Sequence, residues 1–238
     1  MSELKFNYNK KGGVFWNTRY SYFNEMEKIN FDQKLEEIIL KNQSENLVPT
    51  LLLHSCCAPC SSYVLEYLSK YFKITIFYYN PNISPVEEYL KRKEEQKRLI
   101  KEMKCLYPVS IIDCDYDNSL YEEKIKGLEN EPERGGRCSV CFRLRLEKTA
   151  LKAKELGFDY FGTTLTVSPY KNANLLNDIG KELENTYQVS FLVSDFKKKN
   201  GYKRSIELSR EYHLYRQNYC GCKYSKLERE GLLLEKKN

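Results

Sequence analysis

Short apolar runs alternate with segments of helical periodicity along most of the chain. The apolar runs have the length of strands and fall at about residues 47–54, 74–79, 109–113, 160–167 and 191–193. Near-continuous apolar runs of this kind are typical of parallel strands that are buried on both faces. Because strands and helices alternate, we predict an α/β fold with a right-handed, mostly parallel sheet and flanking helices on both faces.

Helical spacing of apolar residues marks the intervals between these runs. It predicts helices at about residues 31–40, 64–71, 85–104, 140–156, 202–212 and 223–234. The third helix has a Ser84/Glu87 capping-box spacing, with Pro85 at its first helical position. The fourth stops at Gly157, a residue suited to the left-handed conformation that follows many helices.

The regular pattern begins at Leu47, and this sets the expected domain organisation. Residues 1–46 are polar, tyrosine-rich and uneven in pattern, so we interpret them as an N-terminal extension packed on the domain. Residues 47–238 form the main α/β domain, whose C-terminal part is helical.

Composition narrows the class of protein. The 238 residues suit one α/β domain with appendages, and the net charge of +6 favours a polyanionic partner. No stretch has the apolar length that spans a bilayer, and the N-terminus lacks the apolar run of a signal peptide. We therefore expect a cytoplasmic protein with no membrane partner, in a compartment where clustered cysteines bind metal or do redox work more often than they form disulfides.

Seven of the nine cysteines fall into three tight groups. The groups are Cys56-Cys57-Ala58-Pro59-Cys60, Cys138-Ser139-Val140-Cys141 and Cys220-Gly221-Cys222. A tetrahedral zinc site and a [4Fe–4S] cubane each take four ligands, so seven clustered thiols exceed the needs of one such centre. Four plus three thiols favour an iron–sulfur cluster beside a second, incompletely ligated metal. Cys105 and Cys114 stand alone, and we expect them to be small packing residues.

The first group lies where the first strand passes into the next helix, a position that often holds a glycine-rich phosphate loop. No glycine is present there, which argues against a nucleotide phosphate site and for a metal site. The positive end of the following helix would stabilise thiolates. Two alternatives stay open for this group. One is a buried apolar turn, and the other is a thioredoxin-like dithiol, which would leave the other two groups without a role.

Six motifs between residues 47 and 225 together resemble the QueH family. They are HSCCAPC at 54–60, YNPNI at 79–83, RGGRCSVCF at 134–142, TTLT at 163–166, SDFKKK at 194–199 and YRQNYCGC at 215–222. Several of these motifs are long and specific. Residues 1–46 lie outside the resemblance.

The resemblance implies an epoxyqueuosine reductase that needs no cobalamin. Such an enzyme reduces the epoxide of epoxyqueuosine, at the wobble position of the tRNA anticodon, to queuosine in the last step of queuosine biosynthesis. The resemblance also implies a nucleotide-hydrolase-like (HUP-type) domain and a [4Fe–4S] cluster beside a mononuclear iron. The cysteines that match the motifs would hold both metal centres, and which of them bind the cluster and which bind the iron stays open. These cysteines are Cys56, Cys57, Cys60, Cys138, Cys141, Cys220 and Cys222. Some family members carry Asp where this chain has Cys60.

Reducing an epoxide to an alkene takes two electrons and two protons. The electrons imply a donor such as ferredoxin or flavodoxin, and an iron with open positions could polarise the epoxide oxygen. His54, Asp113 and Asp195 are candidate proton donors because each lies near the carboxyl end of a predicted strand. The alternatives are a core position for His54 and loop or capping roles for both aspartates.

Basic residues provide the candidate contacts to tRNA phosphates. The candidates are Arg134, Arg137, Lys198, Lys203 and Arg216. For any one basic cluster, a solvated helix or loop face is the alternative. The competing class of protein is a non-catalytic, metal-binding module that binds RNA.

Overall fold

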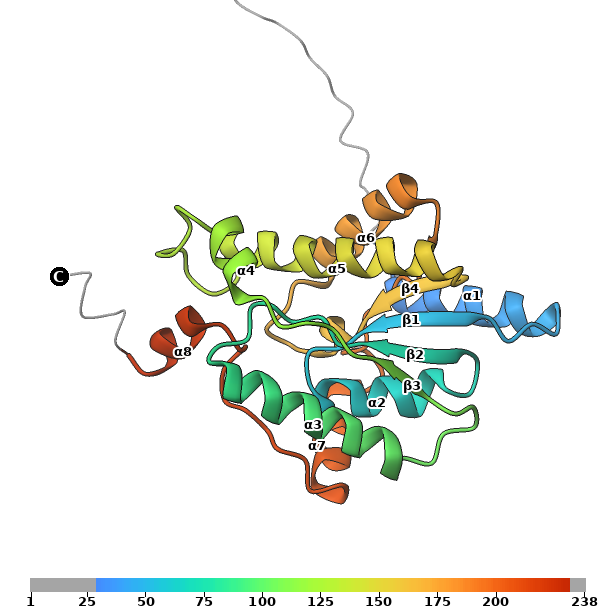
Figure 1. Cartoon of the computed structure of the whole chain (residues 1–238). Helices are drawn as coiled ribbons and strands as arrows, with labels where there is room; N and C mark the ends of the chain where they lie inside the picture. The colour runs from blue at the N-terminus through green and yellow to red at the C-terminus, as the bar shows by residue number, and fades with distance from the viewer. Residues whose placement is uncertain (1–28, 232–238) are drawn as a thin grey trace, which may run out of the picture. The chain divides into compact units, whose positions relative to one another are not determined.

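The computed structural model describes residues 29–231, and five strands in this part of the chain form one parallel sheet in the order β3-β2-β1-β4-β5. The strands are β1 (Thr50–His54), β2 (Lys73–Phe77), β3 (Ser110–Ile112), β4 (Tyr160–Thr163) and β5 (Ser190–Phe191). This confirms the predicted α/β fold, and the order is that of doubly wound, Rossmann-like domains. Because all strands run in one direction, their carboxyl ends meet at one edge of the sheet (Figure 1).

Helices cover both faces of this sheet (Figure 1). The helices of the described residues are α1 (Phe31–Ser44), α2 (Ala58–Leu68), α3 (Val86–Glu102), α4 (Asn118–Lys124), α5 (Gly136–Leu156), α6 (Ala173–Tyr187), α7 (Gly201–Glu211) and α8 (Lys223–Arg229). Of these, α8 lies beyond the carboxyl ends of the strands and not over a face (Figure 1). Successive side chains of β1 point to opposite faces, as in any strand. Leu51 and Leu53 pack into a core with α2 and α3, whereas Leu52 packs into a second core with α5 and α6. None of the helices within residues 29–231 is both long enough and apolar enough to cross a membrane.

α1 belongs to the same compact unit as the sheet. The helix predicted at residues 31–40 is confirmed, and it continues to Ser44. Leu35 and Ile39 are buried in the core that contains α2, and the compact unit begins at Phe31. The compact unit that contains the sheet therefore includes α1. Residues 1–28 of the expected extension lie outside the described residues.

Two local predictions are wrong, and two helices are not predicted by the apolar pattern. Residues 164–167 form a 3₁₀-helix, η1, because the Oγ1 atom of Thr163 accepts a hydrogen bond from the Leu165 amide at 3.1 Å and ends β4. α3 begins after Pro85, with no side-chain cap hydrogen bond, so the expected capping box is not formed. The unpredicted helices are α4 and α6. The predicted stop at Gly157 is confirmed by its left-handed φ of +70°.

Candidate metal centre and active site

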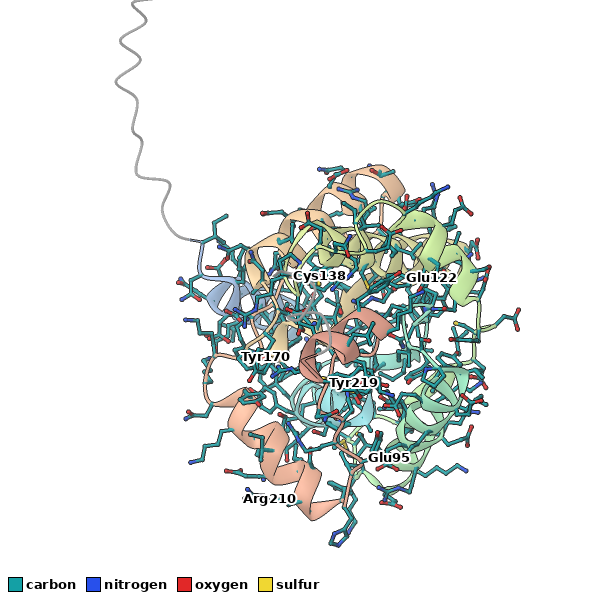
Figure 2. The ribbon with its side chains drawn as sticks, turned by 90° about the vertical axis from the view of Figure 1, so that its left-hand side faces the viewer. Glu95, Glu122, Cys138, Tyr170, Arg210 and Tyr219 are labelled. Carbon is teal, nitrogen blue, oxygen red and sulfur yellow. The ribbon has the colours of Figure 1, made fainter. Side chains whose placement is uncertain are left out.

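All three cysteine groups lie at helix N-termini, at the carboxyl-terminal edge of the sheet that faces the viewer in Figure 2. Cys57 is the N-cap residue of α2, and Cys60 lies in the first turn of that helix. Cys138 lies in the first turn of α5, and Cys222 is the N-cap residue of α8. The partial positive charge of a helix N-terminus stabilises thiolates, so the fold favours metal ligation by these groups.

The first group brings three sulfur atoms together. The Sγ atoms of Cys56, Cys57 and Cys60 all lie within 4.8 Å of one another, and those of Cys56 and Cys57 are 3.7 Å apart. Hydrogen bonds from the thiols of Cys56 and Cys60, together with the charge of Arg92, hold the pKa of Cys57 well below its usual value. This set can therefore present a thiolate and two further thiols to one metal ion.

The second and third groups form a set of four. Burial comes first among the causes that raise the pKa of Cys141 to about 12, and the charges of Cys220, Cys222 and Cys138 add to it. Burial, together with the charges of Cys220 and Cys222, raises the pKa of Cys138. The charges of these thiols therefore act on one another although the two groups are far apart in sequence. Among the described residues, only Cys56, Cys57 and Cys60 have sulfur atoms that all lie within 4.8 Å of one another.

Two buried cations lie beside the set of four. Lys171 donates a hydrogen bond from Nζ to the Sγ atom of Cys220 at 2.8 Å, and it also contacts Glu133. Arg145 is 1% exposed and donates from Nε to the carbonyl of Cys141 at 3.1 Å. Burial opposes ionisation of Cys220, but the charges of Lys171 and Arg145 outweigh it and lower the pKa of that thiol.

A buried polar network holds the loop between β1 and α2. Asn80 donates from Nδ2 to the carbonyl of Ser55 at 2.8 Å. Gln96, from α3, accepts hydrogen bonds from the hydroxyls of both Ser55 and Ser61 at 2.8 Å. Asn80 belongs to the YNPNI motif, so this motif acts by fixing the backbone that carries Cys56 and Cys57.

His54 is part of the same network. Because Asn80 turns its Nδ2 to Ser55, its Oδ1 faces the Nε2 atom of His54 at 3.3 Å, so that ring nitrogen carries the proton. The Nδ1 atom then accepts from the hydroxyl of Thr163 at 3.0 Å. Burial is the main cause that lowers the pKa of His54 to about 3, with the charge of Arg145 second. The ring is neutral at pH 7, and its position fits the alternative of a core residue.

The segment that carries Cys220 is anchored on α3. Arg92 donates to the carbonyl of Cys220 at 3.1 Å and pairs with Glu88 at 2.7 Å. The amide of Ser84 donates to the carbonyl of Gly221 at 2.9 Å. Gly221 has a φ of +135°, and an added Cβ would lie 3.1 Å from Arg92 Nη1. The glycine between the two cysteines is thus required by backbone conformation and by close packing.

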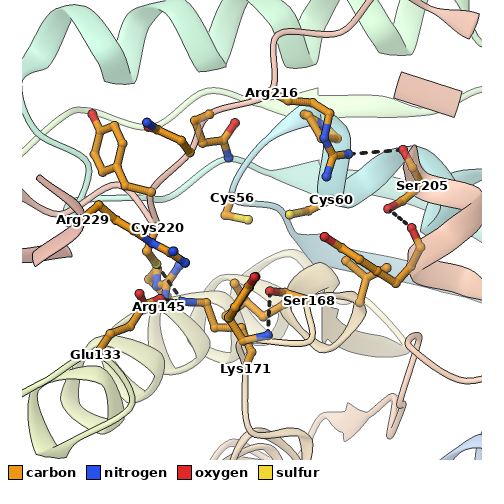
Figure 3. A pocket seen from close by; sticks show the side chains of 18 residues that line it. Cys56, Cys60, Glu133, Arg145, Ser168, Lys171, Ser205, Arg216, Cys220 and Arg229 are labelled. Carbon is orange, nitrogen blue, oxygen red and sulfur yellow. Dashed lines mark hydrogen bonds and ion pairs between the residues drawn. The ribbon is translucent and has the colours of Figure 1, made fainter. Parts of the chain in front are cut away.

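A cavity opens between the two sets of thiols. It is lined by Cys56 and Cys60 from the first set and by Cys220 from the second, with Arg145 and Lys171 among its polar residues. Figure 3 shows the thiols of Cys56 and Cys60 on one side of the cavity and Cys220 with both cations across from them. The empty space within it is about 870 Å³ when the part open to solvent is counted.

The two candidate aspartates do not line this cavity. Asp113 pairs with Lys97 at 2.9 Å and with Lys93 at 3.2 Å. Partial burial acts to raise the pKa of Asp113, but the hydrogen bonds from these lysines outweigh it and lower the pKa. Asp195 pairs with Lys197 at 2.8 Å. These contacts fit structural roles better than proton donation.

The candidate tRNA contacts occupy different environments. Arg137 is 1% exposed and donates to the carbonyls of Glu129 and Glu131, so its position fits a structural role. Lys198 and Lys203 are exposed and lie outside the cavity lining, whereas Arg216 lines the cavity and Arg134 is exposed next to Tyr170. Arg216 also donates to the hydroxyl of Ser209 at 2.9 Å.

Sequence reasoning missed Lys171 and Gln96. Lys171 follows η1 in the turn Ser168-Pro169-Tyr170-Lys171, just after the TTLT motif. The available signal was its place beyond the carboxyl end of β4, where ligand-binding residues of α/β sheets gather. Gln96 lies seven residues after Tyr89 and three before Leu99, so helical spacing places it on the buried side of α3, and only its polar side chain argued against burial.

Fold and site together define a Rossmann-like α/β protein with a thiol-lined cavity at the carboxyl ends of its strands. A family model described as "Epoxyqueuosine reductase QueH" matches residues 51–228. A Streptococcus pyogenes protein of that name is 46% identical over 85% of this chain and 80% of its own length. A Staphylococcus epidermidis protein of the same name is 45% identical over 85% of this chain and 87% of its own length. One from Thermotoga maritima is 36% identical over 76% of this chain and 92% of its own length. The chain belongs to the QueH family.

Proposed function

We propose that this protein reduces epoxyqueuosine in tRNA to queuosine, using metal held by its seven clustered cysteines and no cobalamin. The supporting observation is that Cys56, Cys60 and Cys220, from both sets of thiols, line one cavity that is open to solvent. The names of the relatives supply the substrate. A low-potential one-electron carrier such as ferredoxin or flavodoxin would supply the electrons.

The donor set fits the proposed metals. The four cysteines of the second and third groups equal the ligand number of a [4Fe–4S] cluster, and the three converging sulfurs of the first group would leave a second iron with open positions. Within the described residues, the buried Nη2 atoms of Arg92 and Arg145 have no hydrogen-bond partner, although both guanidinium groups lie near thiols. Buried donors without partners are costly, so these two indicate a negatively charged neighbour such as sulfide or thiolate.

The chain's residues would bind and orient the substrate around that centre. The overall reaction breaks two C–O bonds, consumes two electrons and two protons, and leaves an alkene and water. When bound, the metals would supply single electrons and a Lewis acid. Lys171 and Arg145 would keep positive charge at the cavity wall, where they balance thiolate charge and face an oxygen that gains negative charge.

Two alternative functions, a thioredoxin-like dithiol and a non-catalytic RNA-binding module, fit the site less well. A thioredoxin-like dithiol would use Cys57 and Cys60 alone, and it would leave Cys56, whose sulfur lies within 4.8 Å of both, and Cys220, which lines the same cavity, without a role. A non-catalytic RNA-binding module has no use for a cavity open to the thiols.

The test is an anaerobic assay on the metal-loaded protein. Iron and sulfide are measured first, and then tRNA containing epoxyqueuosine is incubated with protein and a strong reductant but no cobalamin. We expect more iron than one cubane contains, and mass spectrometry of the nucleosides should show loss of one oxygen. An intact epoxide with a fully loaded protein would favour the RNA-binding module. Stoichiometric zinc without sulfide would exclude the iron–sulfur proposal.

A further inference from the structure

Tyr170 is an exposed aromatic residue at the mouth of the cavity. Its side chain is 46% exposed, although it is a large ring that lines the cavity. The next residue, Lys171, turns inward to Cys220. The turn is held by hydrogen bonds from the amides of Tyr170 and Lys171 to the side chain and backbone of Ser168, at 3.3 and 3.1 Å. The ring is therefore fixed one residue away from the thiol-lined interior.

Two arginines from distant parts of the chain lie against this ring. The guanidinium carbon of Arg134 is 5.5 Å from the ring centroid, and that of Arg229 is 5.3 Å from it. Both arginine side chains are exposed, and neither has an ion pair among the described residues. Arg134 also has a strained φ of +79°, and its amide donates to the Sγ atom of Cys138 at 3.2 Å.

Nearby acidic groups do not neutralise these arginines. Glu133 contacts Lys171, and Glu228 accepts a hydrogen bond from the amide of Glu133 at 2.9 Å. The surface thus offers one aromatic ring and two free cations beside the cavity. That combination matches a nucleotide of single-stranded RNA, whose base stacks on aromatic rings and whose phosphates bind arginine.

We infer that Tyr170, Arg134 and Arg229 form a binding site for the nucleotide adjacent to the one that enters the cavity. This inference rests on the proposed function, because it takes an RNA loop as the occupant. The base would stack on Tyr170, and the flanking phosphates would contact the two arginines. Since all three residues are exposed, their replacement leaves the packed core and the thiols in place.

The test measures binding, which does not depend on turnover. A fluorescent RNA stem-loop with the anticodon sequence, without the modification, is titrated with anaerobically purified, metal-loaded protein, and the iron content of every variant is checked. Tyr170→Ala should raise the Kd roughly 5- to 150-fold, given the value of one base stacked on an aromatic ring. Tyr170→Phe keeps the ring and should stay within about twofold. The matched control is Arg210→Gln, an exposed arginine on α7 that Figure 2 shows well apart from Tyr170.

The double variant Arg134→Gln, Arg229→Gln should weaken binding and reduce the slope of log K against log salt by about 0.7 per lost phosphate contact. Unchanged RNA binding by Tyr170→Ala would overturn the inference, as would a Tyr170→Phe variant that binds as poorly as Tyr170→Ala. If Tyr170→Ala binds RNA normally but is reduced more slowly by a protein electron donor, the surface belongs to the donor, and the RNA-site inference is also overturned. A wild-type protein that leaves the epoxide intact, while Tyr170→Ala still loses RNA affinity, would sink the reductase proposal alone.

Discussion

The Nζ atom of Lys171 lies 2.8 Å from the Sγ atom of Cys220, in a place where the lysine side chain is only 8% exposed. Burial acts to lower the pKa of this lysine, but the negative charges of Cys220 and Glu133 outweigh it and raise the pKa. The ammonium group is therefore a fixed positive charge beside a proposed metal ligand. Such a charge makes added electrons more favourable and holds one hydrogen bond to the sulfur.

Lys171→Met removes this charge while keeping the volume of the side chain. We expect the bound iron centre to have a lower reduction potential, because a nearby cation no longer stabilises the reduced state. Turnover should fall roughly tenfold or more, since a hydrogen bond to a charged group is worth about 1.5–3 kcal/mol. A redox titration and a single-turnover assay measure both effects. Lys171→Arg should retain most of the potential, and Lys181→Met, on the exposed side of α6, is the control. An unchanged potential would contradict the assigned role.

Gly221→Ala tests the backbone between Cys220 and Cys222. The added methyl group would lie 3.0 Å from Ile83 Cγ1 and 3.1 Å from Arg92 Nη1, in a residue with a φ of +135°. We expect lower iron content and a loss of about 1–3 kcal/mol in the free energy of unfolding. Gly127→Ala is a matched control, because its φ of +86° is also positive while no atom lies within 4 Å of the added Cβ. Equal losses in the two variants would show that packing at Gly221 has no special importance.

Most of the sheet could be predicted from sequence because its strands are buried on both faces and are apolar throughout. The elements that the apolar pattern did not predict have local physical causes. α6 contains Gly180 and several polar residues, so its helical propensity is weak. The glycine is nevertheless required, since a Cβ there would lie 2.3 Å from the ring of Phe191. Packing between α6 and β5 overrides propensity, and a single sequence does not reveal that packing.

The cysteines were predictable for a different reason. Each group is short, so its spacing predicts that its members lie close together, and the sulfur atoms of Cys56, Cys57 and Cys60 confirm this for the first group. The partners of those groups come from other elements. Lys171 meets Cys220 across 49 positions of sequence, and Arg92 meets the carbonyl of the same residue across 128. The proton-donor candidates were chosen by position at strand ends, a criterion that does not report whether a side chain enters the cavity.

Clustered and solitary cysteines should respond differently to serine. Cys57→Ser replaces a sulfur of the converging set of three with a poor ligand for soft metals, so iron content and turnover should both fall strongly. Cys105→Ser changes a partly buried thiol that packs against the core, and a cost of no more than about 1–2 kcal/mol in stability is expected, with iron content unchanged. Iron analysis and urea unfolding separate the two effects. Similar iron loss in both variants would contradict the prediction that the clustered cysteines, and not the solitary ones, bind the metal.

His54 should make the protein sensitive to acid. Its pKa is lowered to about 3 in the folded protein, against 6.5 for an ordinary histidine, mainly because the ring is buried. Between these values the unfolded chain binds a proton that the folded protein does not, so stability falls as pH decreases through this window. This destabilisation by His54 is absent above about pH 6.5. Near pH 5 the free energy of unfolding falls by about 1.4 kcal/mol for each pH unit of acidification.

His54→Gln removes the titrating ring. The variant should be less stable than wild type at pH 7.5, because hydrogen bonds to Asn80 and Thr163 are altered. The difference between the two proteins should then shrink as the pH is lowered from 6.5 to 4.5. Urea unfolding of metal-loaded protein at several pH values measures this, and metal loss that is common to both proteins cancels in the difference. His213→Asn, at an exposed histidine, is the control and should leave the pH slope unchanged. A constant difference between His54→Gln and wild type across this range would show that the ring is not held neutral by burial.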